Sequence, residues 1–381
     1  MSTSLKNQDN IALFAFRTSQ KLFFEKVIQN CHTEQLAIIS TKNSFKMSLS
    51  ALAKLKEVKL TDACDFAVAE FYAKTNLKIP KILLTLYFKL FSYINFLRYY
   101  ATLNDKYTKM LIWNGGKFRQ RIALEVAKVK KIKVYYFENG LLPNTMVFDA
   151  KGINYENSVP RNKDFYENYS SAIALPTELV PRVGKSREIF TGEKEVLPPK
   201  YIFVPFQVDY DTQIISNSHW IKNMRILFDV IENIAKESEY HFVLKEHPSS
   251  GVEYLDLYER ANMISNISFR NTYSTQELIE KSLAVITINS TVGIESLLFH
   301  KKVIVLGDAF YNIEGITYAV KNEEALLNIV QNVENLEIDI EIINNFLKYL
   351  YHDYLILKDD ERYVKICHRL LEKRTEAYNV H

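Results

Sequence analysis

The stretch LAVITINSTVGIESLLFHKKVIVL, residues 283–306, contains a strand, a helix and a second strand in close succession. Residues 283–288 and 303–306 are short apolar runs rich in β-branched side chains, which is typical of buried strands. Between them, residues 292–299 have the apolar spacing of a helix. Because two strands joined by a helix lie parallel in one sheet, this stretch predicts a parallel α/β domain.

The same alternation extends through the rest of the chain. In the second half, further strands are predicted at 201–205, 241–245 and 267–269, and helices at 221–235, 275–281 and 323–333. In the first half, strands are predicted at 11–16, 35–40, 110–113 and 133–137, with a helix at 117–131. We therefore expect an α/β protein with two Rossmann-like domains.

A polar segment at residues 184–200, GKSREIFTGEKEVLPPK, ends in two prolines and separates the two halves. This composition is typical of an interdomain linker. We predict an N-terminal domain at 1–190, a C-terminal domain at 191–342 and a helical segment at 343–381 that packs back on the first domain.

The composition excludes several classes of protein. The chain has 381 residues, 48% hydrophobic and 24% charged, enough for two apolar cores, and its net charge of +3 does not indicate a nucleic-acid-binding protein. Cys31, Cys64 and Cys367 are odd in number and widely spaced, so we expect no disulfide, no zinc site and a reducing compartment. The polar N-terminus lacks the apolar core of a secretory signal, so we expect a cytoplasmic protein.

Residues 79–100, IPKILLTLYFKLFSYINFLRYY, form an apolar stretch rich in Leu, Phe and Tyr. Lys81, Lys89 and Arg98 interrupt it, so it is too charged to span a membrane. Residues 98–133 then hold ten Lys or Arg against two acidic residues. We expect a helix buried against a sheet. The alternative is a helix that lies in a bilayer interface, which would bring peripheral contact with the inner membrane.

Residues 136–161, YFENGLLPNTMVFDAKGINYENSVPR, follow directly on a predicted strand. Glu138, Asn139 and Gly140 stand where that strand ends, and in parallel α/β sheets ligands bind at this edge. The many Gly, Pro and Asn residues predict an irregular loop of turns. We expect this loop to hold a polar ligand.

Polar residues also follow the strands of the second half, in the segments QVDYDTQ (207–213), KEHP (245–248), NSTVGIE (289–295) and GDAFY (307–311). Ser290 and Thr291 open a helix, whose positive end and free N–H groups suit a phosphate. Glu295, one turn further, suits ribose hydroxyls. His247, next to Lys245 in sequence, suits the binding or protonation of a departing phosphate.

Together these motifs resemble the capsular polysaccharide biosynthesis family of retaining β-Kdo transferases, Kdo being 3-deoxy-D-manno-oct-2-ulosonic acid. The resemblance is carried by FENGLLPNTMVFDAKGINYENSVPR, FQVDYDTQ, KEHP, INSTVGIESLLFHKKVIVLGDAFY and NIEGIT. It implies a GT-B fold, in which two Rossmann-like domains face each other across a cleft. It also implies CMP-Kdo as donor and a saccharide or glycolipid acceptor of a capsule or another surface polysaccharide, together with contact with the assembly machinery. Asn139 stands where the family frequently has an acid.

The resemblance also implies roles for single residues. Retention is most simply achieved by two displacements through a carboxylate, with Asp211 or, alternatively, Asp209 as nucleophile and Glu138 as the base for the acceptor hydroxyl. His247 and Lys245 would stabilise the CMP leaving group, with Ser290 and Thr291 on phosphate and Glu295 on ribose. Further substrate contacts are expected from Gln207, Gln213, Asn154, Asn139 and Gly140, with Arg161 or Lys117 on the Kdo carboxylate.

The segment Asp209-Tyr210-Asp211 imitates the metal-binding DxD motif of another glycosyltransferase architecture. We expect no metal, because lysine, histidine and a helix N-terminus neutralise phosphate instead. Three alternatives stay open. They are a transferase of similar architecture that uses another nucleotide sugar or a polyol phosphate, a non-catalytic polysaccharide- or nucleotide-binding protein, and a membrane scaffold.

Overall fold

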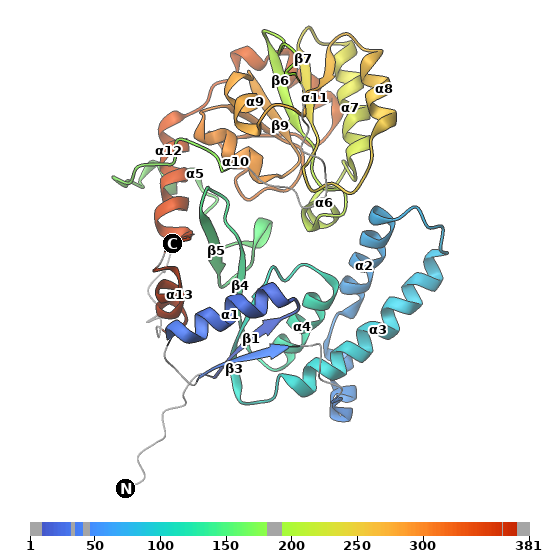
Figure 1. Ribbon diagram of the computed structural model, residues 1–381, viewed down its shortest axis with the longest axis vertical. Coiled ribbons are helices and arrows are strands. Elements are labelled where there is room, and N and C mark those ends of the chain that lie inside the picture. The colour runs from blue at the N-terminus through green and yellow to red at the C-terminus, as the bar shows by residue number, and fades with distance from the viewer. Residues whose placement is uncertain (1–9, 32–34, 41–45, 181–192, 360, 372–381) are drawn as a thin grey trace.

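Two six-stranded sheets form the centres of two α/β units in the computed structural model, which describes residues 10–31, 35–40, 46–180, 193–359 and 361–371 (Figure 1). The strand order is β12-β5-β4-β3-β1-β2 in the first sheet and β11-β10-β9-β6-β7-β8 in the second. Helices flank both sheets, and the two units face each other. This GT-B-like arrangement of two Rossmann-like domains confirms the predicted fold class.

The first sheet is formed by β1 (Asn10–Ala15), β2 (Leu36–Ser40), β3 (Tyr107–Trp113), β4 (Lys133–Asn139), β5 (Thr145–Asp149) and β12 (Ile356–Leu357). Its helical elements are α1 (Thr18–Cys31), η1 (Leu49–Glu57), α2 (Leu60–Lys74), α3 (Lys81–Thr102), α4 (Phe118–Val129), η2 (Asn154–Glu156) and α5 (Lys163–Glu167). The first four strands pair in parallel, whereas β5 is antiparallel to β4 and β12 is antiparallel to β5.

The strand β5 corrects the prediction of an irregular loop after β4. A tight connection, in which the Gly140 N–H donates to the Thr145 carbonyl over 2.9 Å, turns the chain back beside β4. A Cβ on Gly140 would lie 1.9 Å from Thr145 Oγ1, so no larger residue fits this turn. The sequence did not reveal β5 for two reasons. An antiparallel strand needs no crossover helix before it, and the five residues of β5 are surrounded by turn-forming Pro, Asn and Gly.

The second sheet is parallel throughout, as predicted, and consists of β6 (Tyr201–Pro205), β7 (His241–Lys245), β8 (Ile267–Phe269), β9 (Ala284–Thr287), β10 (Lys302–Val305) and β11 (Tyr318–Ala319). Its helical elements are α6 (Thr212–Asn217), α7 (Met224–Lys236), α8 (Leu255–Asn262), α9 (Thr275–Lys281), α10 (Thr291–Leu298), α11 (Glu323–Gln331) and η3 (Val333–Asn335). Side-chain caps define where two of these helices begin. Asn223 is the N-cap of α7 and Ser274 is the N-cap of α9, and each side chain accepts a backbone N–H of its helix.

The C-terminal segment contains α12 (Ile340–Tyr349), the π-helical turn η4 (Leu350–Tyr354) and α13 (Arg362–Leu371). It packs back on the first domain, as predicted, because β12 joins the first sheet and α13 lies against α1. One apolar cluster joins this segment to both domains and includes Leu142 and Val147 of the first, Ile294 and Val303 of the second, and Phe346 of α12. The predicted domain boundaries stay predictions, and residues 184–192 of the predicted linker lie outside the described residues.

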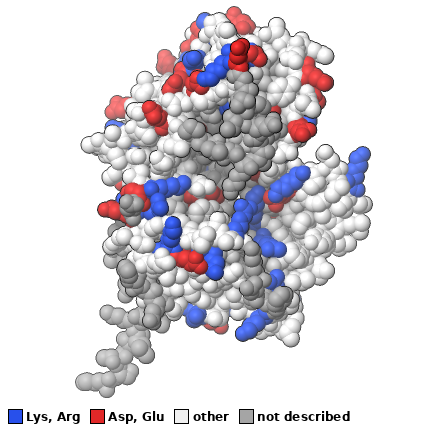
Figure 2. Space-filling model, in the orientation of Figure 1, with Lys and Arg blue, Asp and Glu red and all other residues white. Residues whose placement is uncertain are grey.

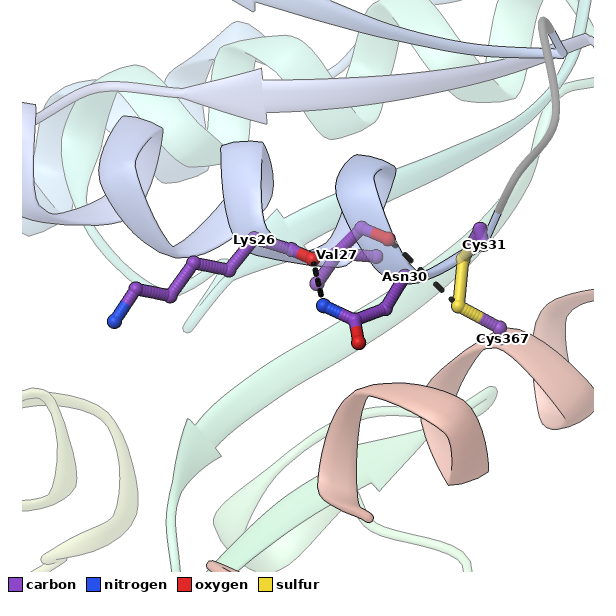
Figure 3. Close-up of a disulfide and its surroundings, with 5 residues drawn as sticks. All are labelled: Lys26, Val27, Asn30, Cys31 and Cys367. Atoms are coloured by element: carbon purple, nitrogen blue, oxygen red, sulfur yellow. Dashed lines mark hydrogen bonds between the residues drawn. A yellow bond between two sulfur atoms is a disulfide. The ribbon is translucent and has the colours of Figure 1, made fainter. Parts of the chain in front are cut away.

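A disulfide between Cys31 and Cys367 ties α1 to α13, with the two Cα atoms 5.3 Å apart (Figure 3). The Cys367 sulfur also lies 3.8 Å from the Val27 carbonyl oxygen, which the reduced thiol could use as an acceptor. The expectation of no disulfide is therefore wrong, and the argument for a reducing compartment from unpaired cysteines falls. The spacing of the cysteines could not reveal this disulfide, because Cys31 and Cys367 are 336 residues apart and meet only when α13 packs on α1.

The predicted helix at 79–100 exists as α3, and its burial is only partly as predicted. Leu84, Phe96 and Tyr99 are buried in the first domain's core, whereas a second apolar face of the helix is exposed. Within the described residues, no helix combines the length and apolar character needed to cross a membrane.

Candidate active site

A cavity of about 520 Å³ lies between the two domains and is lined by residues of both. The first domain and the C-terminal segment contribute Asn114, Glu138 and Lys358, and the second domain contributes Asp211 and His247. The complete set of predicted residues that line it is Glu138, Asn139, Gly140, Asn154, Gln207, Asp211, Gln213, His247, Ser290, Thr291 and Glu295. The carboxyl ends of parallel strands in each sheet bring most of these residues together, as the sequence predicts.

Glu138 lies near the end of β4 and is held from two sides. Its Oε2 accepts a 2.5 Å hydrogen bond from Asn114 Nδ2, and its Oε1 accepts the backbone N–H of Asn139 over 2.8 Å. Burial raises the pKa of the Glu138 carboxyl, the hydrogen bonds from Asn114 and Asn139 oppose this, and the charge of Asp211 raises the pKa further. A carboxylate with a raised pKa is suited to accept a proton.

Asn114 is a residue that the sequence analysis did not select. It follows β3 with a φ of 67°, a left-handed conformation that asparagine tolerates better than most residues. Its Oδ1 accepts the Gly116 N–H over 2.8 Å, which fixes the direction in which its amide donates to Glu138. Asn114 is therefore a positioning residue for the Glu138 carboxylate.

Asp211 faces this first-domain wall from the second domain and is the N-cap of α6. Its Oδ1 accepts the backbone N–H of Gln213 over 2.8 Å and lies 3.3 Å from the Thr212 hydroxyl. The region around α6 also contacts the first domain, since Arg121 donates to Ser216 Oγ over 2.9 Å and Lys117 Nζ donates to the Tyr210 carbonyl over 3.3 Å. These contacts fix Asp211 opposite Glu138.

Asp209, the alternative nucleophile, lies in a different environment. Its side chain is buried, Oδ1 accepts the Met224 N–H over 2.7 Å, and Oδ2 accepts the Tyr254 hydroxyl over 3.1 Å. It does not line the cavity. This geometry favours a structural role for Asp209 and leaves Asp211 as the nucleophile candidate.

The second domain's wall carries the phosphate-binding candidates. Ser290 is the N-cap of α10, and its Oγ accepts the Val292 N–H over 3.2 Å. The Ser290 carbonyl accepts the buried Tyr311 hydroxyl over 2.6 Å. Gly293 permits this packing, because a Cβ there would lie 2.6 Å from the Tyr311 hydroxyl. The start of α10, with Thr291 beside it, thereby keeps a fixed position at the cavity wall.

His247 lines both the main cavity and an adjoining cavity of about 310 Å³, as does Glu295. His247 Nδ1 accepts the Ser249 N–H over 3.1 Å, which selects the neutral tautomer with its proton on Nε2. Lys245 lines the adjoining cavity only, and its Nζ donates to the carbonyls of Asn271 and Tyr273, each over 2.7 Å. Burial lowers the pKa of Lys245 to about 8.

A network of amide side chains supports the floor of the cavity. Gln207 donates to Asn289 Oδ1 over 3.1 Å and accepts the Asn289 N–H over 3.1 Å, which ties the end of β6 to the end of β9. Asn289 Nδ2 in turn donates to the Gln213 carbonyl over 3.1 Å. Gln207 and Gln213 therefore have structural partners in addition to the sugar contacts predicted for them.

Two predicted residues lie elsewhere. Arg161 stacks over the Tyr155 ring at 4.6 Å and donates to the Tyr155 carbonyl, so it does not line the cavity. Lys117 pairs with Glu70 at 2.8 Å and is also absent from the lining. The sequence could not exclude Lys117, because Glu70 meets it only in the folded chain, and Arg161 has its partner within its own loop.

Lys358 lines the main cavity, whereas Arg161 and Lys117 do not. It is the one Lys or Arg among the residues that line the main cavity within the described chain, against the carboxylates Glu138, Asp211 and Glu295. Partial burial and Arg362 lower the pKa of Lys358, and the charge of Glu138 opposes this. Its backbone N–H donates to the Asn144 carbonyl over 2.7 Å, which holds the C-terminal segment at the β4–β5 connection.

Among the described residues, no group of three His, Cys, Asp or Glu side chains is arranged to hold a metal ion. Metal-independent chemistry stays a prediction.

The Asn114–Glu138 contact gives a testable pH dependence. Asn114→Gly keeps the left-handed backbone and removes the hydrogen bond that favours charged Glu138, so the Glu138 pKa should rise. A base works in its deprotonated form, so the acidic limb of the kcat/KM profile should move to higher pH. A profile with an unmoved limb, or one shifted to lower pH, would contradict the positioning role.

Comparisons with known proteins place these residues in a family. A family model described as "Capsule polysaccharide biosynthesis protein" matches residues 108–186 and 188–363. Protein FixF of Sinorhizobium fredii is 36% identical over 255 residues, which are 65% of this chain and 60% of FixF. The capsule polysaccharide export protein KpsS of Escherichia coli is 25% identical over 252 residues, 50% of this chain and 65% of KpsS. The chain thus spans less than two-thirds of the length of these relatives.

Among solved structures, KpsC of Thermosulfurimonas dismutans, described as a beta Kdo 2,7 transferase, is similar with 15% sequence identity. The match has a TM-score of 0.48 and covers 96% of this chain and 99% of that chain. The family model spans both walls of the cavity, from β3 through Glu138, Asp211 and His247 to Lys358. Since it matches well over half of the residues, the chain belongs to the capsule polysaccharide biosynthesis protein family.

Proposed function

We propose that this protein is a glycosyltransferase that transfers Kdo from CMP-β-Kdo to a saccharide or glycolipid acceptor with retention of configuration. The observation that carries the proposal is the pairing of Glu138 and Asp211, from opposite domains, in one cavity. Their charges are coupled, because Asp211 raises the pKa of Glu138. Two carboxylates with different environments are suited to a base and a nucleophile.

In the first step, an Asp211 carboxylate oxygen attacks the anomeric carbon of Kdo. The bond from that carbon to the phosphate oxygen breaks, CMP leaves with the electron pair, and a glycosyl ester forms. The Asp211 Oδ1 is already engaged with the Gln213 N–H, so we assign the attack to Oδ2. His247 and the start of α10 at Ser290 and Thr291 would stabilise the charge on the departing phosphate.

In the second step, the acceptor hydroxyl attacks the same carbon and gives its proton to Glu138. The ester bond breaks, the Asp211 carboxylate is restored and the β-linkage forms with net retention. The adjoining cavity, lined by Lys245, His247 and Glu295, offers space for the nucleoside of the donor.

Lys358 is our candidate for the acidic group of the transferred sugar. Loss of one charged hydrogen bond costs about 1.5–3 kcal/mol, so Lys358→Met should raise KM for the donor roughly 10- to 100-fold with a smaller change in kcat. Lys358→Arg should retain most of the affinity. Steady-state kinetics of the two variants would show this, and a wild-type KM in Lys358→Met would remove Lys358 from substrate recognition.

The reaction should proceed without a metal. Lys358 and the N-terminus of α10 supply positive charge near the donor, and His247 can donate a hydrogen bond from Nε2, so transfer should survive treatment with EDTA. Loss of activity with EDTA and recovery with a divalent ion would contradict this and return attention to the Asp209-Tyr210-Asp211 segment.

A donor assay tests the function itself and separates it from the alternatives. CMP-Kdo, CMP-sialic acid, UDP-sugars and polyol-phosphate donors are each incubated with the full chain and an acceptor panel, and nucleotide release is followed by chromatography. We expect turnover with CMP-Kdo. Turnover only with another donor would support the assignment as a glycosyltransferase and contradict the assignment of CMP-Kdo as its donor. Nucleotide binding without turnover of any donor would favour a non-catalytic binding protein.

A further inference from the structure

The helix α3 has an exposed apolar face that the proposed reaction does not use. Ile82, Leu83, Leu86, Tyr87 and Leu90 form this α3 face, and each is between 56% and 70% exposed. Their spacing places them on one side of the helix. The opposite side, with Leu84, Phe96 and Tyr99, is buried in the first domain's core.

An exposed apolar face of this size indicates an interaction site. Single exposed apolar residues are normal on protein surfaces, but contiguous groups of large apolar side chains mark interaction sites. The hairpin of α2 and α3 projects from the body of the first domain, so the face is accessible along its length (Figure 1). In Figure 2 the projection is largely white, with basic side chains at its tip.

The charges around the α3 face indicate the kind of partner. Lys78 and Lys81 at the tip of the hairpin and Lys89 within α3 are exposed, and residues 75–104 contain no acidic residue. The last carboxylate of α2, Glu70, already pairs with Lys74 and Lys117. The face therefore combines exposed aliphatic side chains and a tyrosine with a positive border.

We infer that the α3 face docks on an anionic lipid surface. Amphipathic helices of this composition lie in the bilayer interface, with apolar side chains among the acyl chains and lysines at the anionic headgroups. Tyrosine is enriched at this level of a bilayer. A second copy of the chain fits less well, because a symmetric contact through the same face would bring the lysines of both copies together.

The position of the hairpin relates this surface to the cavity. Lys74, at the end of α2, lies 4.9 Å above the ring of Tyr210, which precedes Asp211. The end of α2 therefore contacts the second domain next to the residue that carries the nucleophile candidate. The docking itself does not depend on the identity of the donor or on any activity.

Vesicle flotation of the full chain tests the inference. Binding to phosphatidylcholine vesicles that contain phosphatidylglycerol should be about 100-fold tighter than binding to pure phosphatidylcholine, since three lysines contribute about fivefold each. High salt should reduce this difference. Lys78→Gln, Lys81→Gln and Lys89→Gln combined should abolish it.

Apolar variants provide the second arm. Ile82→Ser, Leu86→Ser and Leu90→Ser should each weaken binding to the anionic vesicles about tenfold. The matched control is Leu255→Ser with Met263→Ser, because these residues at α8 are 69% and 84% exposed and lie in the other domain. The control should bind like the wild type. Equal unfolding midpoints would show that the variants remain folded.

Several results would overturn the inference. They are no binding to anionic vesicles, binding that the α3 variants leave unchanged, and equal affinity for neutral and anionic vesicles. Light scattering coupled to gel filtration adds a further arm. A dimer that the α3 variants dissociate would identify a second copy as the occupant and would also overturn the lipid assignment.

Discussion

Asp211→Ala is expected to lower transfer of Kdo by about four decades or more, the scale seen when a covalent catalytic residue is removed. Without the carboxylate no glycosyl ester forms, and both CMP release and product formation stop. The measurement is single-turnover kinetics with CMP-Kdo and an acceptor.

The control for this variant addresses the second role of Asp211. Its Oδ1 caps α6, and loss of an N-cap costs about 1 kcal/mol of stability. Asp211→Asn keeps an acceptor at that position and should retain the stability of the wild type with the same loss of activity. Substantial transfer by Asp211→Asn would exclude Asp211 as the nucleophile.

Glu138→Gln is expected to slow the second step by roughly two to four decades, the usual contribution of a general base. The first step should be less affected, because CMP is a better leaving group than a sugar hydroxyl is a nucleophile. The glutamine still accepts a hydrogen bond at the position that Asn114 contacts. Rapid-quench kinetics should show a burst of CMP followed by slow turnover.

A Glu138→Gln protein without a burst, but with both steps slowed equally, would contradict the assignment of Glu138 to the acceptor step. Asn139 provides a nearby control, because it lines the same cavity and its side chain has no proton-transfer role in the proposed mechanism. Asn139→Ala should retain the ratio of the two step rates, even where substrate affinity falls.

Much of the fold could be predicted because its signals are local. The strands β6, β7 and β8 have the predicted bounds, since each is a short apolar run with polar or turn-forming residues at its ends. β5 was missed because its apolar run follows a tight turn and adds an antiparallel strand without a helix. The burial expected for residues 79–100 was only partly right, because a helix that is apolar on two sides resembles a buried helix in sequence, and the sequence does not show which side has a neighbour.

The site residues that follow the ends of strands could be predicted from the sequence. Glu138, Asp211, His247 and Ser290 follow strands at the edges that meet in the cavity, so the parallel topology brings them together. Lys358 and Asn114 escaped prediction for different reasons. Lys358 reaches the cavity only because β12 pairs with β5, and Asn114 carries no chemical signal apart from its contact with Glu138. The disulfide depends in the same way on the packing of α13 against α1.

The most direct test of the central claim is the mass of the Glu138→Gln protein after incubation with CMP-Kdo. We predict that the protein gains the mass of one Kdo residue and that peptide mapping places it on the segment containing Asp211. An adduct on Asp209 would keep the covalent mechanism and move the nucleophile. Absence of any adduct, together with an active Asp211→Ala protein, would contradict the covalent mechanism.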